Sequence, residues 1–303
     1  MTMHSIRLKG ILPPLTTPFN EVGDVDFEAL SRNVRLYNET GLGGYVALGS
    51  NGEVAHLSTD ERVRVVETIK REAAPGLTVV AGVNEHSTRA AIEAAQRAAG
   101  AGADAALIIT PYFYKSSMTR LAFERHFEKV ADHSPIPVLL YNVPQNTGVV
   151  IDSQAIASLA AHPNIIGVKD SAGNFAAIAE TIRLAPKEFT VLTGNGGILY
   201  PSLMMGARGA VLAVACAAPR ACVELYEAVE AGDHAKARDL QSRIAPLSHL
   251  VTAGLGVAGL KAAMEMTGFE GGAVRAPLVE VEASDREKIR VVMRETGLFP
   301  NME

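Results

Sequence analysis

A lysine ends one of the most apolar stretches of the chain. The run Asn164-Ile165-Ile166-Gly167-Val168 leads directly to Lys169, and a polar turn follows it. Burial disfavours a charged ammonium, and a neutral amine is a nucleophile that attacks carbonyl carbons. Lys169 is therefore a candidate for Schiff-base chemistry. The alternative is a strand-end lysine whose ammonium extends into solvent, and this segment alone does not choose between the two.

Other apolar runs also end in side chains that suit binding or proton transfer. The turn Gly49-Ser50-Asn51-Gly52-Glu53 offers a hydroxyl, an amide and backbone N–H groups that suit a small anion; the alternative is an ordinary turn in which Ser50 or Asn51 caps a helix. Tyr141 ends another run and is a candidate for proton transfer at Lys169. We interpret Tyr112 as a half-buried tyrosine. At the glycine-rich turn that contains Gly194, we expect the backbone to approach a small substrate.

The elements that must position these residues follow a regular pattern. Eight short runs rich in Val, Ile and Leu alternate with amphipathic stretches whose helix-start signals include Asp26, Ser58, Ser87 and Asp152. Continuous apolar strands are typical of parallel sheets buried on both faces, so the pattern predicts a (β/α)8 TIM barrel. The active site of such a barrel lies at the carboxyl ends of its strands. The predicted strands are Gly10–Leu15, Gly44–Gly49, Thr78–Val83, Ala105–Thr110, Pro137–Tyr141, Ile165–Lys169, Phe189–Gly194 and Gly209–Ala215.

The last part of the chain has a different, helical pattern. After about residue 218 the strand-like runs stop, and helices are predicted over Arg220–Ala231, His234–Ala253, Leu260–Thr267 and Asp285–Thr296. We therefore predict a barrel over residues 1–218 and an all-helical C-terminal region over residues 219–303.

Composition excludes several classes of function. The chain has 303 residues, a formal net charge of -5 and scattered Lys and Arg, which argues against nucleic-acid binding. No GxGxxG follows the first run, no GxSxG is present, and no histidines stand at HxH or HxxxH spacing, so we expect no dinucleotide, no Ser-His-Asp hydrolase and no metal. Cys216 and Cys222 have no CxxC spacing and are predicted to be reduced core residues. No apolar leader or membrane span is apparent, which predicts a cytoplasmic protein without a membrane partner.

Taken together, five motifs resemble the dihydrodipicolinate synthase/N-acetylneuraminate lyase superfamily of class I pyruvate-dependent aldolases. They are Pro13 to Phe19, GSNGE at Gly49 to Glu53, ITPYF at Ile109 to Phe113, YNVPxxTG at Tyr141 to Gly148 and GVKDS at Gly167 to Ser171. The resemblance implies a Schiff base between Lys169 and a 2-oxo acid, with Tyr141 as proton shuttle and no separate cofactor. It also implies that Ser50, Asn51 and Gly52 bind the pyruvyl carboxylate, that Thr16 and Val211 line the pocket, and that the chain is a homotetramer built as a dimer of dimers.

Three positions depart from the pattern of dihydrodipicolinate synthases. Those enzymes usually have an arginine where this chain has Asn146, and a cross-subunit tyrosine where it has Phe113, next to Tyr112. Their turn commonly reads GTTGE rather than GSNGE. Asn146, GSNGE, GVKDS and the tail segments Gly259–Lys261 and Arg275–Leu278 instead resemble the 4-hydroxy-2-oxoglutarate aldolase branch. Phe113 departs from that branch as well.

The leading sequence hypothesis is therefore a Schiff-base lyase that cleaves 4-hydroxy-2-oxoglutarate to pyruvate and glyoxylate. The first alternative is a dihydrodipicolinate synthase (4-hydroxy-tetrahydrodipicolinate synthase), which condenses pyruvate with aspartate semialdehyde. Two further alternatives are an aldolase or dehydratase of 2-keto-3-deoxy sugar acids and a catalytically silent regulator that binds a 2-oxo acid. In every case the expected partner is a small 2-oxo acid.

Overall fold

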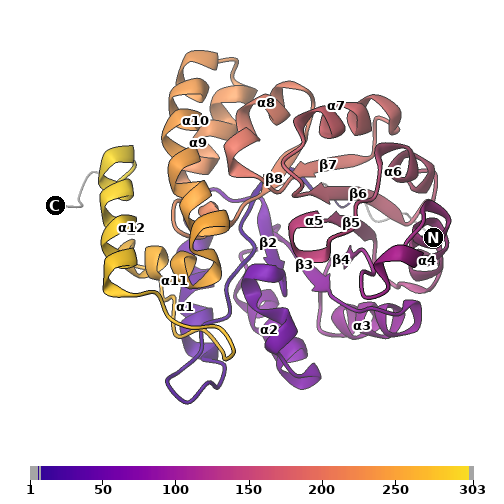
Figure 1. Ribbon diagram of the computed structural model, residues 1–303, viewed down its shortest axis with the longest axis horizontal. Coiled ribbons are helices and arrows are strands. Elements are labelled where there is room, and N and C mark those ends of the chain that lie inside the picture. Colours follow the sequence, from indigo (N-terminus) through magenta and orange to yellow (C-terminus); the bar gives the residue numbers. More distant parts are fainter. Residues whose placement is uncertain (1–5, 7, 300–303) are drawn as a thin grey trace.

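Eight parallel strands form the centre of the protein. The computed structural model describes residue 6 and residues 8–299. Part of the N-terminal segment in which the sequence predicts no apolar leader therefore lies outside the described residues. Figure 1 shows the strands surrounded by helices, with the C-terminal helices on one flank. The strands are β1 (Gly10–Leu12), β2 (Gly44–Ala47), β3 (Thr78–Val83), β4 (Ala105–Ile109), β5 (Val138–Asn142), β6 (Ile165–Asp170), β7 (Thr190–Thr193) and β8 (Gly209–Val211).

The sheet closes into the predicted barrel. Its strand order runs β1-β8-β7-β6-β5-β4-β3-β2. The two ends of this order meet through the N–H of Gly43, which donates to Ile11 O at 3.0 Å, and the N–H of Val46, which donates to Pro13 O at 3.0 Å. The chain is thus a (β/α)8 barrel with a C-terminal helical extension.

All eight predicted strands are present, and five of them (the first, second, fourth, seventh and eighth) are shorter than predicted, the first and the eighth most of all. The first ends at Leu12 because Pro13 and Pro14 have no N–H to donate to a continuing ladder. The eighth was expected to reach Ala215 but ends at Val211, and a 3-10 turn over Ala213–Cys216 follows it.

The helices begin where the sequence places their caps. The side chains of Asp26, Ser87 and Asp152 each accept a backbone N–H of the helix that follows, and Ser58 forms a reciprocal capping box with Glu61. These caps satisfy N–H groups that have no partner within the helix. The helices up to β8 are α1 (Phe27–Asn38), α2 (Thr59–Glu72), α3 (Thr88–Gly100), α4 (Arg120–His133), α5 (Pro144–Thr147), α6 (Ser153–Leu159), α7 (Phe175–Leu184) and α8 (Leu199–Met204).

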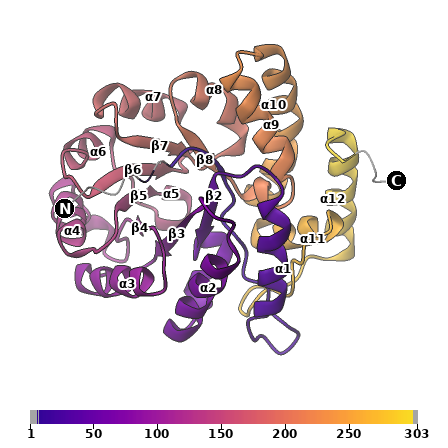
Figure 2. The ribbon, with the colours of Figure 1, turned by 180° about the vertical axis from the view of Figure 1, so that it is seen from behind.

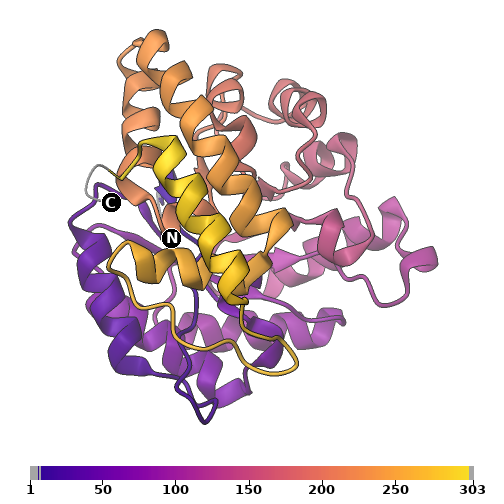
Figure 3. The same ribbon diagram turned by 60° about the vertical axis from the view of Figure 1, so that its left-hand side comes forward.

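Up to residue 299, four α-helices follow the last strand, as predicted. They are α9 (Pro219–Glu230), α10 (His234–His249), α11 (Gly256–Met266) and α12 (Ala283–Thr296), with a π-helical turn at Leu250–Gly254. α9 contacts β1, whereas α12 packs on α10 and α11. Figure 3 shows α10, α11 and α12 together on one side of the barrel, and Figure 2 shows α1 beside them from behind. The division of the chain at residue 218 stays a sequence interpretation.

The interior of the barrel is filled with side chains. Inward-facing residues of the strands form one buried cluster, to which both Tyr141 and Val211 belong. A packed interior leaves the carboxyl ends of the strands as the place where a substrate can enter. Within the described residues, no helix combines the length and apolarity needed to cross a membrane.

Candidate active site at the carboxyl ends of the strands

Lys169 and Tyr141 are direct neighbours on adjacent strands. They are register partners in the β5–β6 ladder, and Lys169 Nζ lies 4.3 Å from the centre of the Tyr141 ring. Lys169 is 4% exposed and Tyr141 is 6% exposed. The predicted proximity of the two residues is confirmed, and the alternative of an ammonium extended into solvent is wrong. A buried amine next to a phenol has the two groups that Schiff-base chemistry and proton transfer require.

No carboxylate neutralises Lys169 within the part of the chain that the structure describes. No ion pair among those residues includes Lys169. The carboxylate of Asp170, the next residue, accepts hydrogen bonds from the Asn142 side chain at 2.8 Å and from the N–H of Ala172 at 2.9 Å. Burial raises the pKa of Asp170, and the hydrogen bonds from Asn142 and Ala172 oppose that effect. Asp170 therefore ties the ends of β5 and β6 together and leaves the neighbouring amine to react.

The turn after β2 lies next to Tyr141. Ser50 Oγ lies 3.3 Å from the Tyr141 hydroxyl, and the turn Ser50–Gly52 is a 3-10 turn in which Gly49 occupies the cap position. The alternative in which the side chain of Ser50 or Asn51 caps a helix is therefore wrong. Thr17, which sequence reasoning missed, donates its hydroxyl to Gly52 O at 2.7 Å and holds the turn in place.

Thr16 and Val211 are both buried. Thr16 is buried and points its hydroxyl at Met264 Sδ, 3.4 Å away, on α11. Val211 is the last residue of β8 and is 2% exposed in the same interior cluster as Tyr141. These positions fit the lining role that the resemblance implies.

Gly194 has a structural reason to lack a side chain. A Cβ at this position would lie 1.9 Å from Ser171 Oγ, and the Gly194 N–H donates to Asp170 O at 2.6 Å. The space beside Gly194 is therefore occupied by Ser171, the residue after the β6 ladder, and the approach of the Gly194 backbone to a substrate stays a prediction. Gly194 lets the ends of β6 and β7 approach each other beside Lys169.

None of the three residues Asn146, Tyr112 and Phe113 is fully buried. Asn146 is exposed on the short helix α5. Tyr112 packs edge-on against His86 with ring centroids 4.5 Å apart, and Phe113 is 70% exposed and packs edge-on against Tyr114. No described hydrogen bond joins them to Lys169 or Tyr141, so their part in the site stays a prediction.

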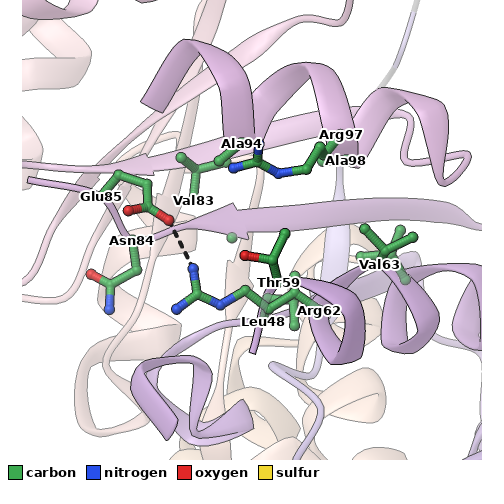
Figure 4. A pocket seen from close by; sticks show the side chains of 12 residues that line it. Leu48, Thr59, Arg62, Val63, Val83, Asn84, Glu85, Ala94, Arg97 and Ala98 are labelled. Atoms are coloured by element: carbon green, nitrogen blue, oxygen red, sulfur yellow. Dashed lines mark hydrogen bonds and ion pairs between the residues drawn. The ribbon is translucent and has the colours of Figure 1, made fainter. Parts of the chain in front are cut away.

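The sequence assigns no catalytic role to two further features. Cys216 and Cys222 are buried free thiols, as predicted, and burial raises the pKa of Cys222 to about 12. Figure 4 shows a small cavity in the outer layer between α2 and α3, crossed by the 2.8 Å ion pair of Arg62 with Glu85. It contains none of the predicted site residues. Among the described residues, no group of three His, Cys, Asp or Glu side chains gathers as metal ligands would.

Comparison with known proteins identifies the family. The sequence pattern of the dihydrodipicolinate synthetase family matches residues 7–296. The chain belongs to this family. It is 39% identical over 286 residues to a 4-hydroxy-tetrahydrodipicolinate synthase of Methanothrix thermoacetophila, covering 94% of this chain and 96% of the relative. Enzymes of the dihydrodipicolinate synthetase family are lyases and synthases that work through a Schiff base, and the protein is a lyase.

Solved structures give the same assignment. Dihydrodipicolinate synthase DapA-2 of Bacillus anthracis superposes with a TM-score of 0.91 at 27% identity, over 95% of this chain and 98% of that one. YagE, a prophage protein of the dihydrodipicolinic acid synthase family from E. coli K12 solved in complex with pyruvate, superposes with a TM-score of 0.90 at 29% identity, over 96% and 99% of the two chains.

The comparisons do not support the leading sequence hypothesis of a 4-hydroxy-2-oxoglutarate aldolase. Relatives of this chain are named 4-hydroxy-tetrahydrodipicolinate synthase, which is the first alternative that the sequence suggested. The tail segments that suggested the aldolase branch contact the scaffold. Lys261 forms an ion pair with Glu53, and the backbone N–H of Arg275 donates to the same carboxylate.

Proposed function

We propose that the protein condenses pyruvate with aspartate semialdehyde, through a Schiff base at Lys169. The observation that carries this proposal is the buried pair of Lys169 and Tyr141 on neighbouring strands, with Ser50 Oγ 3.3 Å from the Tyr141 hydroxyl. The names of the relatives support the choice of acceptor. The pyruvate complex of YagE supports the choice of 2-oxo acid.

The first half of the reaction uses groups that lie together at the end of β6. The Lys169 amine attacks the C2 carbonyl carbon of pyruvate, water leaves, and an iminium forms that draws electrons from C3. Loss of a C3 proton then gives an enamine. Tyr141 is placed to carry protons between the reacting atoms and Ser50. We assign the pyruvate carboxylate to the turn Ser50-Asn51-Gly52, and the methyl side to the wall formed by Thr16 and Val211.

The second half joins the two substrates. The enamine carbon attacks the aldehyde carbon of the acceptor, a C–C bond forms, the aldehyde oxygen takes up a proton to become a hydroxyl, and the iminium at Lys169 is restored. The amino group of the acceptor then adds to C2 and displaces the Lys169 amine, which closes the ring and frees the enzyme. This sequence needs no oxidant, metal or bound cofactor, because the electrons stay within the two substrates and Lys169.

The acceptor carries a carboxylate, and the chain has Asn146 where an arginine is usual. We assign this carboxylate to Lys115 as well as Asn146. The Lys115 side chain lies over Gly148 in the loop after β5, so close that a Cβ on Gly148 would stand 2.8 Å from Lys115 Nζ. A lysine there supplies the positive charge that the loop itself lacks, as a point charge rather than a bidentate fork.

Borohydride trapping tests the Schiff base. Reduction in the presence of pyruvate is expected to add the mass of the reduced adduct to the peptide that contains Lys169. Lys169→Ala is expected to abolish the adduct, whereas Lys187→Ala, which removes an exposed lysine elsewhere, keeps it. An adduct that survives in Lys169→Ala disproves the assignment.

A substrate panel then tests the acceptor. We expect turnover with pyruvate plus aspartate semialdehyde and much less with 4-hydroxy-2-oxoglutarate or 2-keto-3-deoxy sugar acids. The reverse preference would refute the proposed acceptor and keep the Schiff base. Trapping by pyruvate without turnover of any acceptor, and without exchange of the C3 protons, would identify a binding protein instead.

We also propose that the protein acts as a homotetramer in the cytoplasm. The exposed side chains of Phe113 and Tyr114 support an interface near Tyr112, because large exposed apolar side chains often mark interaction sites. Phe113 has no hydroxyl, so a proton relay through a partner subunit does not run through this residue. Sedimentation velocity measures the assembly directly.

A further inference from the structure

Backbone strain concentrates at the turn that is assigned to the pyruvate carboxylate. Among the described residues, two non-glycine positions have positive φ, Leu48 at 56° and Glu53 at 52°. They flank the turn Gly49–Gly52 on either side. A residue with a side chain avoids this left-handed conformation unless its surroundings impose it. The turn is therefore held at both ends by contacts from elsewhere in the fold.

At the first end, the contact is steric. The Leu48 carbonyl oxygen occupies the space beside Gly82 on β3, where a Cβ would lie 2.1 Å from it. The absence of a side chain at Gly82 lets the chain turn sharply after β2. This end of the turn is therefore fixed by the barrel itself.

At the second end, the contact is a buried ion pair with the C-terminal region. Glu53 Oε1 lies 2.6 Å from Lys261 Nζ on α11, and the two side chains are 1% and 2% exposed. Lys261 Nζ also donates to Thr17 O at 2.8 Å and to Ala273 O at 2.6 Å. Two of the three N–H groups of the ammonium are thus taken by backbone carbonyl oxygens, and its contact with Glu53 Oε1 is an ion pair rather than an aligned hydrogen bond.

The other oxygen of Glu53 is held from the same side. Glu53 Oε2 accepts the N–H of Arg275 at 2.9 Å. The guanidinium of Arg275 is anchored in turn on Glu61, Gly23 O and His56 O. Thus one carboxylate gathers two segments of the C-terminal region at the end of the turn that carries Ser50 and Asn51.

Burying the two charges of this contact carries a desolvation cost. Burial lowers the pKa of the Lys261 ammonium, and only the nearby Glu53 and other acidic groups counter that effect. A buried ion pair often contributes no more stability than apolar residues of the same size. What apolar residues would not reproduce is the directed contact that places Glu53, and with it the preceding turn, at a fixed distance from α11.

We propose that Glu53 and Lys261 are positioning residues for the substrate carboxylate, so that the C-terminal helical region sets the geometry of the turn Ser50–Gly52. The pair touches no reacting atom and acts through the turn. The inference rests on the proposed function for its effect on pyruvate, and on the structure alone for its effect on the turn. Both effects are measurable, and they fail separately.

The first experiment measures the turn without any substrate. Hydrogen–deuterium exchange, read by mass spectrometry, is compared in the wild type, Lys261→Met and the control Arg286→Met, which breaks the 2.8 Å ion pair of Arg286 with Glu265 in the same helical region. Lys261→Met is expected to speed exchange at least tenfold in the peptide that contains Gly49–Glu53. Arg286→Met is expected to leave this peptide unchanged. Equal exchange in Lys261→Met and the wild type would overturn the proposal.

The second experiment measures pyruvate. The concentration that gives half-maximal borohydride trapping is expected to rise at least tenfold in Lys261→Met, while saturating pyruvate still labels Lys169 completely. The double variant Glu53→Gln/Lys261→Met removes both charges and so avoids leaving one unpaired in the core. If the pair serves stability alone, this folded double variant binds pyruvate as the wild type does, and the proposal is wrong. If it positions the turn, half-saturation stays raised.

The two failures are distinguishable. Absence of trapping in the wild type refutes the proposed function, and the exchange experiment still decides the role of the pair. Wild-type trapping together with unchanged half-saturation in the double variant refutes the positioning role and leaves the proposed function intact.

Discussion

His126 gives a quantitative prediction about acid stability. It lies on α4, is 5% exposed, and its Nδ1 stands 2.9 Å from Thr88 Oγ1. Burial lowers its pKa from the ordinary value of 6.5 to about 4, because the imidazolium loses its hydration. Arg125, Glu128, Lys129 and Asp132 line the cavity beside it.

The sign of the effect follows from proton binding. Between the two pKa values the unfolded chain takes up a proton at this histidine and the folded protein does not. The stability contributed by the neutral imidazole is therefore complete above about pH 6.5 and falls as the pH falls toward 4. The loss from this one group amounts to about 2 kcal/mol at about pH 5, and it approaches about 3 kcal/mol below pH 4.

Urea unfolding at about pH 7.5 and about pH 5 measures this loss. We compare the wild type with His126→Gln, which keeps a hydrogen-bonding side chain that does not titrate, and with the control His133→Gln, an exposed histidine on the same helix. Other titrating groups contribute equally to all three and cancel in the comparison. The wild type and His133→Gln are expected to lose about 2 kcal/mol more than His126→Gln. An equal loss in all three proteins would refute the reasoning.

Two further predictions concern the site. Tyr141→Phe keeps the ring beside Lys169 and removes the hydroxyl next to Ser50. We expect kcat to fall by roughly 10²- to 10⁴-fold, while prolonged incubation with pyruvate and borohydride still labels Lys169. An unchanged kcat would exclude Tyr141 from proton transfer. Lys115→Met is expected to raise the KM for aspartate semialdehyde roughly tenfold, because one charge contact is lost. The pyruvate concentration that gives half-maximal trapping is expected to stay unchanged. Steady-state kinetics measures both constants, and equal KM values in wild type and variant would remove Lys115 from the acceptor site.

The scaffold was predictable because it depends on local patterns. Continuous apolar runs mark strands buried on both faces, and the caps at Asp26, Ser58, Ser87 and Asp152 mark helix starts, so each element is visible within its own segment. The ends of the strands were less predictable. The eighth run continues apolar into Ala213–Cys216, and composition does not distinguish a buried strand from a buried 3-10 turn.

The site was predictable in part. Lys169 and Tyr141 end consecutive strands, and parallel pairing of those strands places their ends side by side. The hydroxyl contact of Thr17 with Gly52 gave no signal in the sequence, because a threonine in a loop has many possible partners. Gly194 was visible as a special residue, and the sequence did not reveal that the space beside it belongs to Ser171.

By itself, the sequence determined the barrel, the lysine at the end of its sixth strand and the tyrosine at the end of its fifth. These features follow from the period and composition of short segments. Only the tertiary structure decided that Glu53, Lys261 and Arg275 meet in one buried contact. They come from motifs far apart in the chain, and a contact between such motifs depends on how the C-terminal helices pack on the barrel. Lys261 looked like a marker of substrate branch in the sequence, and in the fold it is part of the support for the turn next to Tyr141.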